Sequence, residues 1–392
     1  MSSLDISLVT TAAVVPILSM GIEKILNNIT DLNKDELEKL YQEIVKKTSN
    51  EQISKEQQII KLIEAYKSGK LVLTLGAGIA KEHGLPDWNT LLQELFIDAI
   101  MSETKETKER SLVLSKLFTE FGMSNPLLSA RYLRYHYQNN TKVIDNLSFE
   151  KAVKQVIYDK IKINVNSELF KEIRQLCIAA GNNPNLNSII TYNYDDVLEK
   201  FLSSLEIDIP FKSIYGNGIN PSYGELPIYH VHGFLPQNGE LSKITLSEDI
   251  YHQQYNDIYS WNNIVQINKF RDNICIFIGL SFTDPNLRRI LDIARLQKGH
   301  SDDYHYLVKN HYNANKLKEN IEKYLELNPS ILNEKQKANL NLDETVNYLV
   351  NITEKFEEKD ALSFGVQIIW VDDYAQIPII LRQIRKMDLN SK

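Results

Sequence analysis

Residues 71–88 read LVLTLGAGIAKEHGLPDW, which is an apolar run, two glycines separated by one residue, and the beginning of a helix. A short continuous apolar run is typical of a central parallel strand that is covered on both faces. Gly76 and Gly78 allow a tight turn that approaches a phosphate closely, and the following helix would offer its free N–H groups to that anion. Lys81 stands where the dinucleotide-binding fingerprint has its third glycine. The turn is therefore either a nucleotide-binding turn or a plain strand-to-helix connection.

Further apolar runs of strand length follow this turn, and helical patterns separate several of them. The runs cover residues 188–193, 211–215, 228–233, 243–247, 274–279, 304–308 and 366–371. This alternation predicts an α/β fold with a Rossmann-like, doubly wound parallel sheet. Since ligands of such sheets bind beyond the carboxyl ends of the strands, the residues after each run are the candidates for chemistry.

Two regions have only helical periodicity. Residues 1–66 form a predicted N-terminal helical segment, and residues 67–392 a single α/β domain with a helical insertion at about 91–183. Residues 6–22 carry no charge, yet they are short for a membrane span and no basic stretch precedes them. We expect a buried or oligomer-forming helix there, which makes the N-terminal segment a candidate for oligomerisation.

Composition restricts the class of protein. The 392 residues are 43% hydrophobic with a net charge of -7, as in an ordinary folded protein, and the basic residues form no stripe that would indicate nucleic-acid binding. The two cysteines, Cys177 and Cys275, are too few for a disulfide framework or a four-cysteine zinc module. We therefore expect a cytoplasmic protein.

Polar residues follow the run at 188–193. Asn193 and Asp195 lie two apart, so both side chains can face a crevice at the strand end. Asp195 or Asp196 can equally cap the helix that follows.

The run at 228–233 contains two histidines. His230 and His232 alternate, so both are expected on one face of a strand. No cluster at a supporting spacing favours a metal site. A histidine before Gly233 suits a general base, and a core or surface histidine is the alternative.

The residues after the run at 274–279 combine a helix cap with a candidate ligand site. Gly279 permits close backbone approach, and Ser281 can hydrogen-bond a ribose. Asp284 followed by Pro285 predicts an N-cap with proline in the first turn.

The order and spacing of these motifs resemble the sirtuin family, in its bacterial defence-associated, sirtuin-like branch. GAGIA resembles the family's GAGIS turn, GLPDW its GIPDF segment, TYNYD its TQNID motif, HVHG its histidine-glycine pair and GLSF its GTSL turn. Together the five motifs cover about residues 70–300.

The resemblance implies a role for each matching residue. Gly76, Ala77 and Gly78 would cradle the pyrophosphate of NAD, with Gly279 in the turn whose Ser281 contacts the adenosine ribose; Asp87 and Trp88 would belong to a mobile loop over NAD. Asn193 would hold the nicotinamide ribose and position water, Asp195 would meet the carboxamide, and His232 would act on the ribose hydroxyls, with His230 as its neighbour.

The departures from the family favour NAD cleavage by water. The deacylases of the family have a four-cysteine zinc module and a smaller insertion, and Asn89 stands where the family often has arginine. Without a zinc module a groove for an acyl-lysine peptide is not expected, so NAD is the substrate and water the acceptor. The predicted products are nicotinamide and ADP-ribose.

The resemblance also implies a biological role and a partner. Sirtuin-like proteins of this branch are NAD-depleting effectors of anti-phage defence that assembly or a partner restrains, which implies a homo-oligomer and a HerA-type ATPase as a candidate partner. A sensor that binds NAD or ADP-ribose without cleavage, and a zinc-free protein deacylase, are the alternatives. We see no carboxylate pair for a two-metal nuclease.

Overall fold

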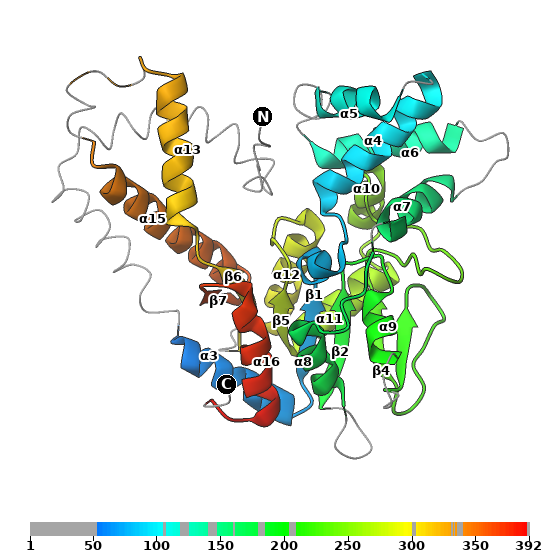
Figure 1. Ribbon diagram of the computed structural model, residues 1–392. Coiled ribbons are helices and arrows are strands. Elements are labelled where there is room, and N and C mark those ends of the chain that lie inside the picture. The colour runs from blue at the N-terminus through cyan, green and yellow to red at the C-terminus, as the bar shows by residue number, and fades with distance from the viewer. Residues whose placement is uncertain are drawn as a thin grey trace. The chain divides into compact units, whose positions relative to one another are not determined.

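The computed structural model describes residues 53–389 except 105–106, 118–124, 140–146, 160, 179–184, 204–208, 300–302, 331, 333 and 335–339 (Figure 1). Most of the predicted N-terminal helical segment, including residues 6–22, lies outside the described residues. Its last helix is confirmed as α3 (Lys55–Lys67). Gly69 follows with a φ of 66°, the left-handed conformation expected of a glycine that ends a helix.

Seven strands form one parallel sheet with the order β3-β4-β2-β1-β5-β6-β7. They are β1 (Leu71–Leu75), β2 (Leu186–Thr191), β3 (Phe211–Ile214), β4 (Leu226–His230), β5 (Ile274–Ile278), β6 (His305–Asn310) and β7 (Val366–Val371). All five residues of β1 are buried, and β2 and β5 pair with it on either side. The predicted Rossmann-like α/β fold is confirmed.

One predicted strand is wrong. Residues 243–247 form a loop rather than a strand, although Ile244 and Leu246 are buried. Both side chains pack into an apolar cluster with the helices that follow β1, and Thr245 N donates to His232 O in the turn after β4. The apolar alternation in this stretch therefore reflects packing against helices instead of membership of the sheet.

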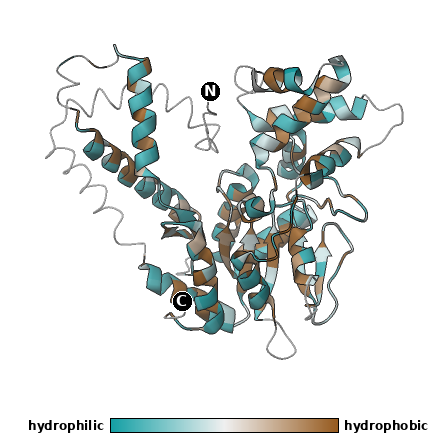
Figure 2. Ribbon diagram, viewed as in Figure 1, coloured by the Kyte–Doolittle hydropathy of each residue, from teal (hydrophilic) through white to brown (hydrophobic). Residues whose placement is uncertain are grey.

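The predicted helical insertion between β1 and β2 is present. It contains α4 (Trp88–Thr104), α5 (Lys108–Leu117), α6 (Pro126–Asn139), α7 (Ser148–Asp159) and α8 (Glu168–Cys177). Leu95 of α4, Leu133 of α6 and Val153 of α7 are almost fully buried against one another in the apolar cluster, and Figure 2 shows hydrophobic residues on these helices. The helices of the insertion thus share an apolar core with the segment that follows β4.

The other helices connect or follow the strands. They are α9 (Val197–Ser203), α10 (Glu248–Asn256), α11 (Trp261–Asp272), α12 (Pro285–Lys298), α13 (Ala314–Leu327), α15 (Leu342–Ser363) and α16 (Ile377–Lys386). The N-cap predicted for α12 is confirmed, because Asp284 Oδ1 accepts a hydrogen bond of 2.7 Å from Leu287 N. Across the described part of the chain, no helix combines the length and apolarity that crossing a membrane requires.

The chain divides into two compact units. One comprises residues 56–308 and 375–392, and the other residues 1–55 and 309–374. Strands β1 to β5 and every candidate site residue belong to the first unit. The predicted division into residues 1–66 and 67–392 stays a prediction.

The strand order places a switch point at β1. From β1 the chain builds β2, β3 and β4 on one side and then returns to place β5 on the other side. In an open parallel sheet, ligands bind outside the carboxyl ends of the strands at such a point. The ends of β1, β2, β4 and β5 are therefore where a site is expected.

Candidate active site

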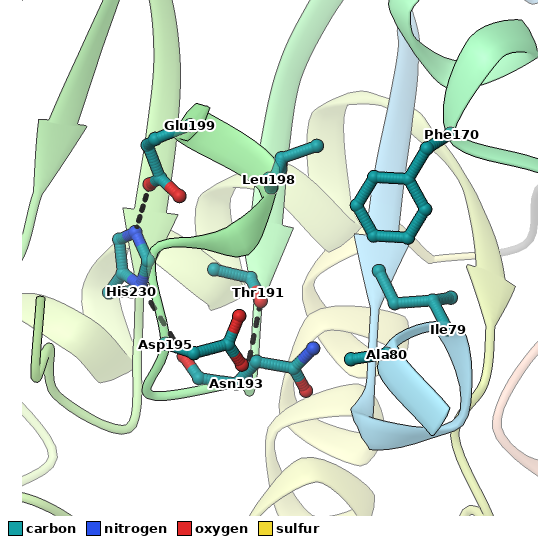
Figure 3. Close-up of a pocket in the computed structure, with 9 residues that line it drawn as sticks. All are labelled: Ile79, Ala80, Phe170, Thr191, Asn193, Asp195, Leu198, Glu199 and His230. Atoms are coloured by element: carbon teal, nitrogen blue, oxygen red, sulfur yellow. Dashed lines mark hydrogen bonds and ion pairs between the residues drawn. The ribbon is translucent and has the colours of Figure 1, made fainter. Parts of the chain in front are cut away.

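A cavity lies beyond the carboxyl ends of β1, β2 and β4. It contains about 250 Å³ of space, part of which is open to solvent. Its wall consists of Ile79, Ala80, Phe170, Thr191, Asn193, Asp195, Leu198, Glu199 and His230. Apolar Phe170, Ile79 and Ala80 stand on one side, and Glu199 and His230 on the other (Figure 3). The cavity therefore has one apolar wall and one wall of titratable groups.

The glycines after β1 and β5 allow two turns to approach closely. A Cβ added to Gly76 would lie 2.5 Å from Gly279 O, and one added to Gly78 would lie 2.7 Å from Gly279 Cα. Gly279 has a φ of 72°, and its carbonyl oxygen accepts a 2.9 Å hydrogen bond from Gly78 N. The packing of the two turns thus requires all three glycines, and the Gly78 N–H is already bonded within the protein.

Asn193 follows the end of β2 and points into the cavity (Figure 3). Its backbone N donates to Thr191 Oγ1 at 3.1 Å, which fixes the turn after the strand. Its side-chain Oδ1 is buried and has no hydrogen-bond partner among the described residues. Since an unpaired buried acceptor costs about 1–3 kcal/mol, this oxygen is suited to receive a donor from a ligand.

Asp195 lies in the same wall and is only 5% exposed. Its Oδ1 accepts a 3.0 Å hydrogen bond from Val197 N, so it also serves the start of α9, as the capping alternative predicted. The pKa of Asp195 is raised to about 6, chiefly by burial; the Val197 N–H opposes the rise, and Glu199 adds to it. This carboxyl can therefore exist with or without a proton near neutral pH.

His230 ends β4 and forms a buried pair with Glu199. Its Nε2 lies 2.6 Å from Glu199 Oε1, and its Nδ1 lies 3.3 Å from Asn193 O. The side chains of His230 and Glu199 are 1% and 9% exposed. The sequence placed His230 as a neighbour of the site, and the structure places it in the cavity wall.

His232 does not line this cavity. The expectation that it shares a strand face with His230 is wrong, because β4 ends at His230 and His232 lies in the following turn. Its ring packs edge-on against Tyr192, with 4.7 Å between ring centroids, and its Nε2 lies 3.6 Å from Asp284 Oδ2. Burial lowers the pKa of His232, and Asp284 opposes that fall.

Four other predicted site residues lie outside the cavity wall. Asp87 caps α4 by accepting a 3.0 Å hydrogen bond from Thr90 N, and Trp88 begins α4 and packs against the apolar cluster of the insertion. Ser281 is exposed after β5, with its hydroxyl 2.7 Å from Thr283 Oγ1, and Ala77 is exposed after β1. These residues surround the switch point but do not meet in the described cavity.

The sequence reasoning missed Glu199 and Phe170. Glu199 follows Asp195 by four residues across the start of α9, a spacing that places two side chains on one helix face, and this signal was available. Phe170 comes from α8, at the end of the insertion, and nothing in its local sequence indicates the cavity.

Metal ligands do not gather in the described part of the chain. No group of three or more His, Cys, Asp or Glu side chains suited to a metal ion occurs among the described residues. Cys177 and Cys275 are both buried, and burial raises the pKa of each thiol to about 12. Neither thiol is therefore primed as a nucleophile.

Comparison with known proteins identifies a domain and distant relatives. Residues 187–329 match the family model of a SIR2-like domain. The chain is 23% identical to the NAD(+) hydrolase ThsA of Enterococcus faecium over 326 residues, which cover 82% of this chain and 56% of that protein. It is also 23% identical to the NAD(+) hydrolase ThsA of Cytobacillus dafuensis over 299 residues, 72% of this chain and 50% of that protein. The chain thus spans about half the length of these relatives.

Proposed function

We propose that this chain cleaves the bond between nicotinamide and ribose in NAD and transfers the ribosyl group to water. The observation that carries the proposal is the buried, unpartnered Oδ1 of Asn193 in a cavity at the sheet's switch point. The SIR2-like match includes Asn193, and the printed names of the two relatives give NAD hydrolysis as their activity.

The residues of the cavity suit the chemistry of this reaction. Loss of nicotinamide creates oxocarbenium character at the ribose C1′, so the ribose must be oriented and its positive charge stabilised. Asn193 Oδ1 can accept a hydrogen bond from a ribose hydroxyl or an attacking water. A carboxylate at Asp195 would place negative charge beside the developing cation, and Phe170 and Ile79 offer an apolar surface to the nicotinamide ring.

The glycine corner suits the rest of the dinucleotide. Ala77 and Gly78 are exposed at the end of β1, and Ser281 is exposed at the end of the neighbouring β5. We place the diphosphate and the adenosine ribose along this edge, as the family resemblance implies. His232 stays our candidate for action on the ribose hydroxyls. Since it does not line the described cavity, we expect it to reach NAD only if the turn that holds it shifts.

Nicotinamide release from NAD tests the proposal. Asn193→Ala removes the side-chain amide and keeps the backbone bonds of the residue, so the fold should persist. We expect kcat to fall at least 100-fold, the scale on which losing one preorganised polar group acts. Asn187→Ala is the matched control, because Asn187 lies on β2, the strand that precedes Asn193, bonds Lys269 and lies outside the cavity wall. It should keep its kcat.

The same assay separates the alternatives. NAD binding without nicotinamide release would indicate a sensor, and release only in the presence of an acyl-lysine peptide would indicate a deacylase. Full wild-type activity in Asn193→Ala would contradict the assigned role of this residue. An unchanged kcat in His232→Ala would contradict the candidate role of His232 on the ribose hydroxyls.

We further propose that the activity depletes NAD in defence against phage and is restrained by self-assembly or by a HerA-type ATPase. The family resemblance supports this role, and the helical segment of residues 1–66 is our candidate for self-assembly. Light scattering of the full chain gives its mass in solution, and a monomer that hydrolyses NAD at full rate would contradict restraint by assembly.

A further inference from the structure

Glu199 and His230 form a buried pair for which the resemblance assigns no role. The Glu199 carboxylate uses Oε1 for two hydrogen bonds, one with His230 Nε2 at 2.6 Å and one from Ser213 Oγ at 2.9 Å. Its Oε2 is buried without a partner among the described residues. Both side chains are nearly excluded from water, and removing a carboxyl group and an imidazole from water costs free energy. We therefore ask what this pair does for the site.

The hydrogen-bond partners determine the protons on His230. Nε2 faces a carboxylate oxygen and Nδ1 faces the carbonyl oxygen of Asn193 at 3.3 Å. A carbonyl oxygen only accepts, so Nδ1 donates to Asn193 O, and Nε2 is left to share a proton with the carboxyl group of Glu199. The geometry therefore describes an imidazole ring whose orientation is fixed at both nitrogens.

The contacts of His230 and Glu199 connect four separate parts of the fold. Ser213 belongs to β3, Glu199 to α9, His230 to the end of β4, and Asn193 to the turn after β2. The hydrogen bond from His230 Nδ1 is accepted by the backbone carbonyl oxygen of Asn193. The position of the Asn193 side chain in the cavity thus depends on the same residue that Glu199 orients (Figure 3).

We propose that Glu199, acting through His230, is a positioning residue that holds Asn193 in its reactive orientation. This inference rests on the proposed function, because it assigns a consequence to the orientation of Asn193. A residue that acts through another should affect the chemical step more than the binding of NAD. Glu199 and His230 should also act as one unit rather than independently.

A double-mutant cycle on nicotinamide release tests this proposal with the full chain. We expect Glu199→Gln to lower kcat at least tenfold while KM changes less than threefold. We expect His230→Ala to lower kcat by at least as much. The double variant should then be within threefold of His230→Ala, because Glu199 has nothing left to orient.

Two results would overturn the proposal. One is multiplication of the two single effects in the double variant, which would mean that Glu199 acts on the substrate directly. The other is a wild-type kcat in Glu199→Gln. Glu64→Gln is the control for the chemical change, since Glu64 is an exposed residue of α3 that pairs with Lys61. Glu64→Gln should have the kcat and KM of the wild type.

Folding of the variants is checked by thermal unfolding. If Glu199→Gln does not fold, Glu199→Asp keeps the charge and shortens the side chain by one methylene group, which breaks the 2.6 Å contact with His230. It should lower kcat and leave KM within threefold, and an unchanged kcat would overturn the proposal. Absence of nicotinamide release in the wild type would instead contradict the proposed function, so the two failures are distinguishable.

Discussion

Replacing Asp195 with asparagine should stabilise the protein above pH 6 and leave its stability unchanged near pH 4. Burial raises the pKa of Asp195 from 3.8 to about 6. The folded state therefore holds this proton more tightly than the unfolded state, and the resulting stability is present below pH 3.8 and is lost as the pH rises through about 6. A pKa difference of about 2 between the folded and unfolded states changes the free energy of unfolding by about 3 kcal/mol between low and high pH.

Asparagine avoids this loss because it never ionises. Its side-chain oxygen can still accept the hydrogen bond from Val197 N, so the start of α9 should be preserved. The free energy of unfolding in urea is measured for both proteins at intervals from pH 4 to pH 8, without NAD. The difference in favour of Asp195→Asn should rise from near zero to about 3 kcal/mol.

A matched control separates burial from the local turn. Asp257 is exposed and its Oδ1 accepts the same type of hydrogen bond, from Tyr259 N two residues later. Asp257→Asn makes the same chemical change at an exposed turn where the burial argument does not apply, so a gain of about 3 kcal/mol at pH 8 should not appear. The reasoning is refuted if the Asp195→Asn difference is also constant across the pH range, or if this variant is the less stable one at pH 8.

Two further pairs of variants test the framework of the site by urea unfolding. Gly279→Ala should cost about 3 kcal/mol, because its Cβ would lie 2.7 Å from a backbone nitrogen at positive φ. Gly69→Ala has a similar φ at the end of α3 but open space around its Cβ, and should cost about 1 kcal/mol. Glu172→Gln should cost about 2–3 kcal/mol, because Glu172 is 7% exposed and binds two arginines of α16, whereas Glu168→Gln, at 61% exposure, should change stability by less than about 0.5 kcal/mol. Equal losses within the glycine pair would contradict the close packing at Gly279, and equal losses within the glutamate pair would contradict the role of burial at Glu172.

Most strands of the sheet could be predicted because a strand that is buried on both faces needs a continuous run of apolar residues, and such a run is visible in the sequence. The uninterrupted apolar run of β1 and the Asp-Pro start of α12 are local signals, and both are confirmed. The run at 243–247 has the same local appearance, yet it packs against helices of the insertion. Local alternation reports that residues are buried, and only the tertiary contacts decide which element they bury against.

The two histidines show a second limit of sequence reasoning. A spacing of two residues places side chains on one face only while the strand continues, and β4 ends at the first histidine. His230 therefore pairs with Glu199, and His232 packs against Tyr192. The motif therefore predicts the correct end of β4. The two rings have different surroundings because the strand ends between them.

The polar wall of the cavity lowers the stability of the fold, because it buries a hydrogen-bond acceptor that no described residue satisfies. A buried acceptor without a partner costs about 1–3 kcal/mol, and Asn193 Oδ1 has none among the described residues. On the opposite side, Phe170 and Ile79 fill the wall without such a cost. A ligand that brings O–H donors would satisfy this oxygen, and the ribose hydroxyls of NAD, the substrate we propose, are such donors. We therefore attribute the unpaired oxygen of Asn193 to the ligand that the cavity receives, whereas Glu199 and His230 already bond one another.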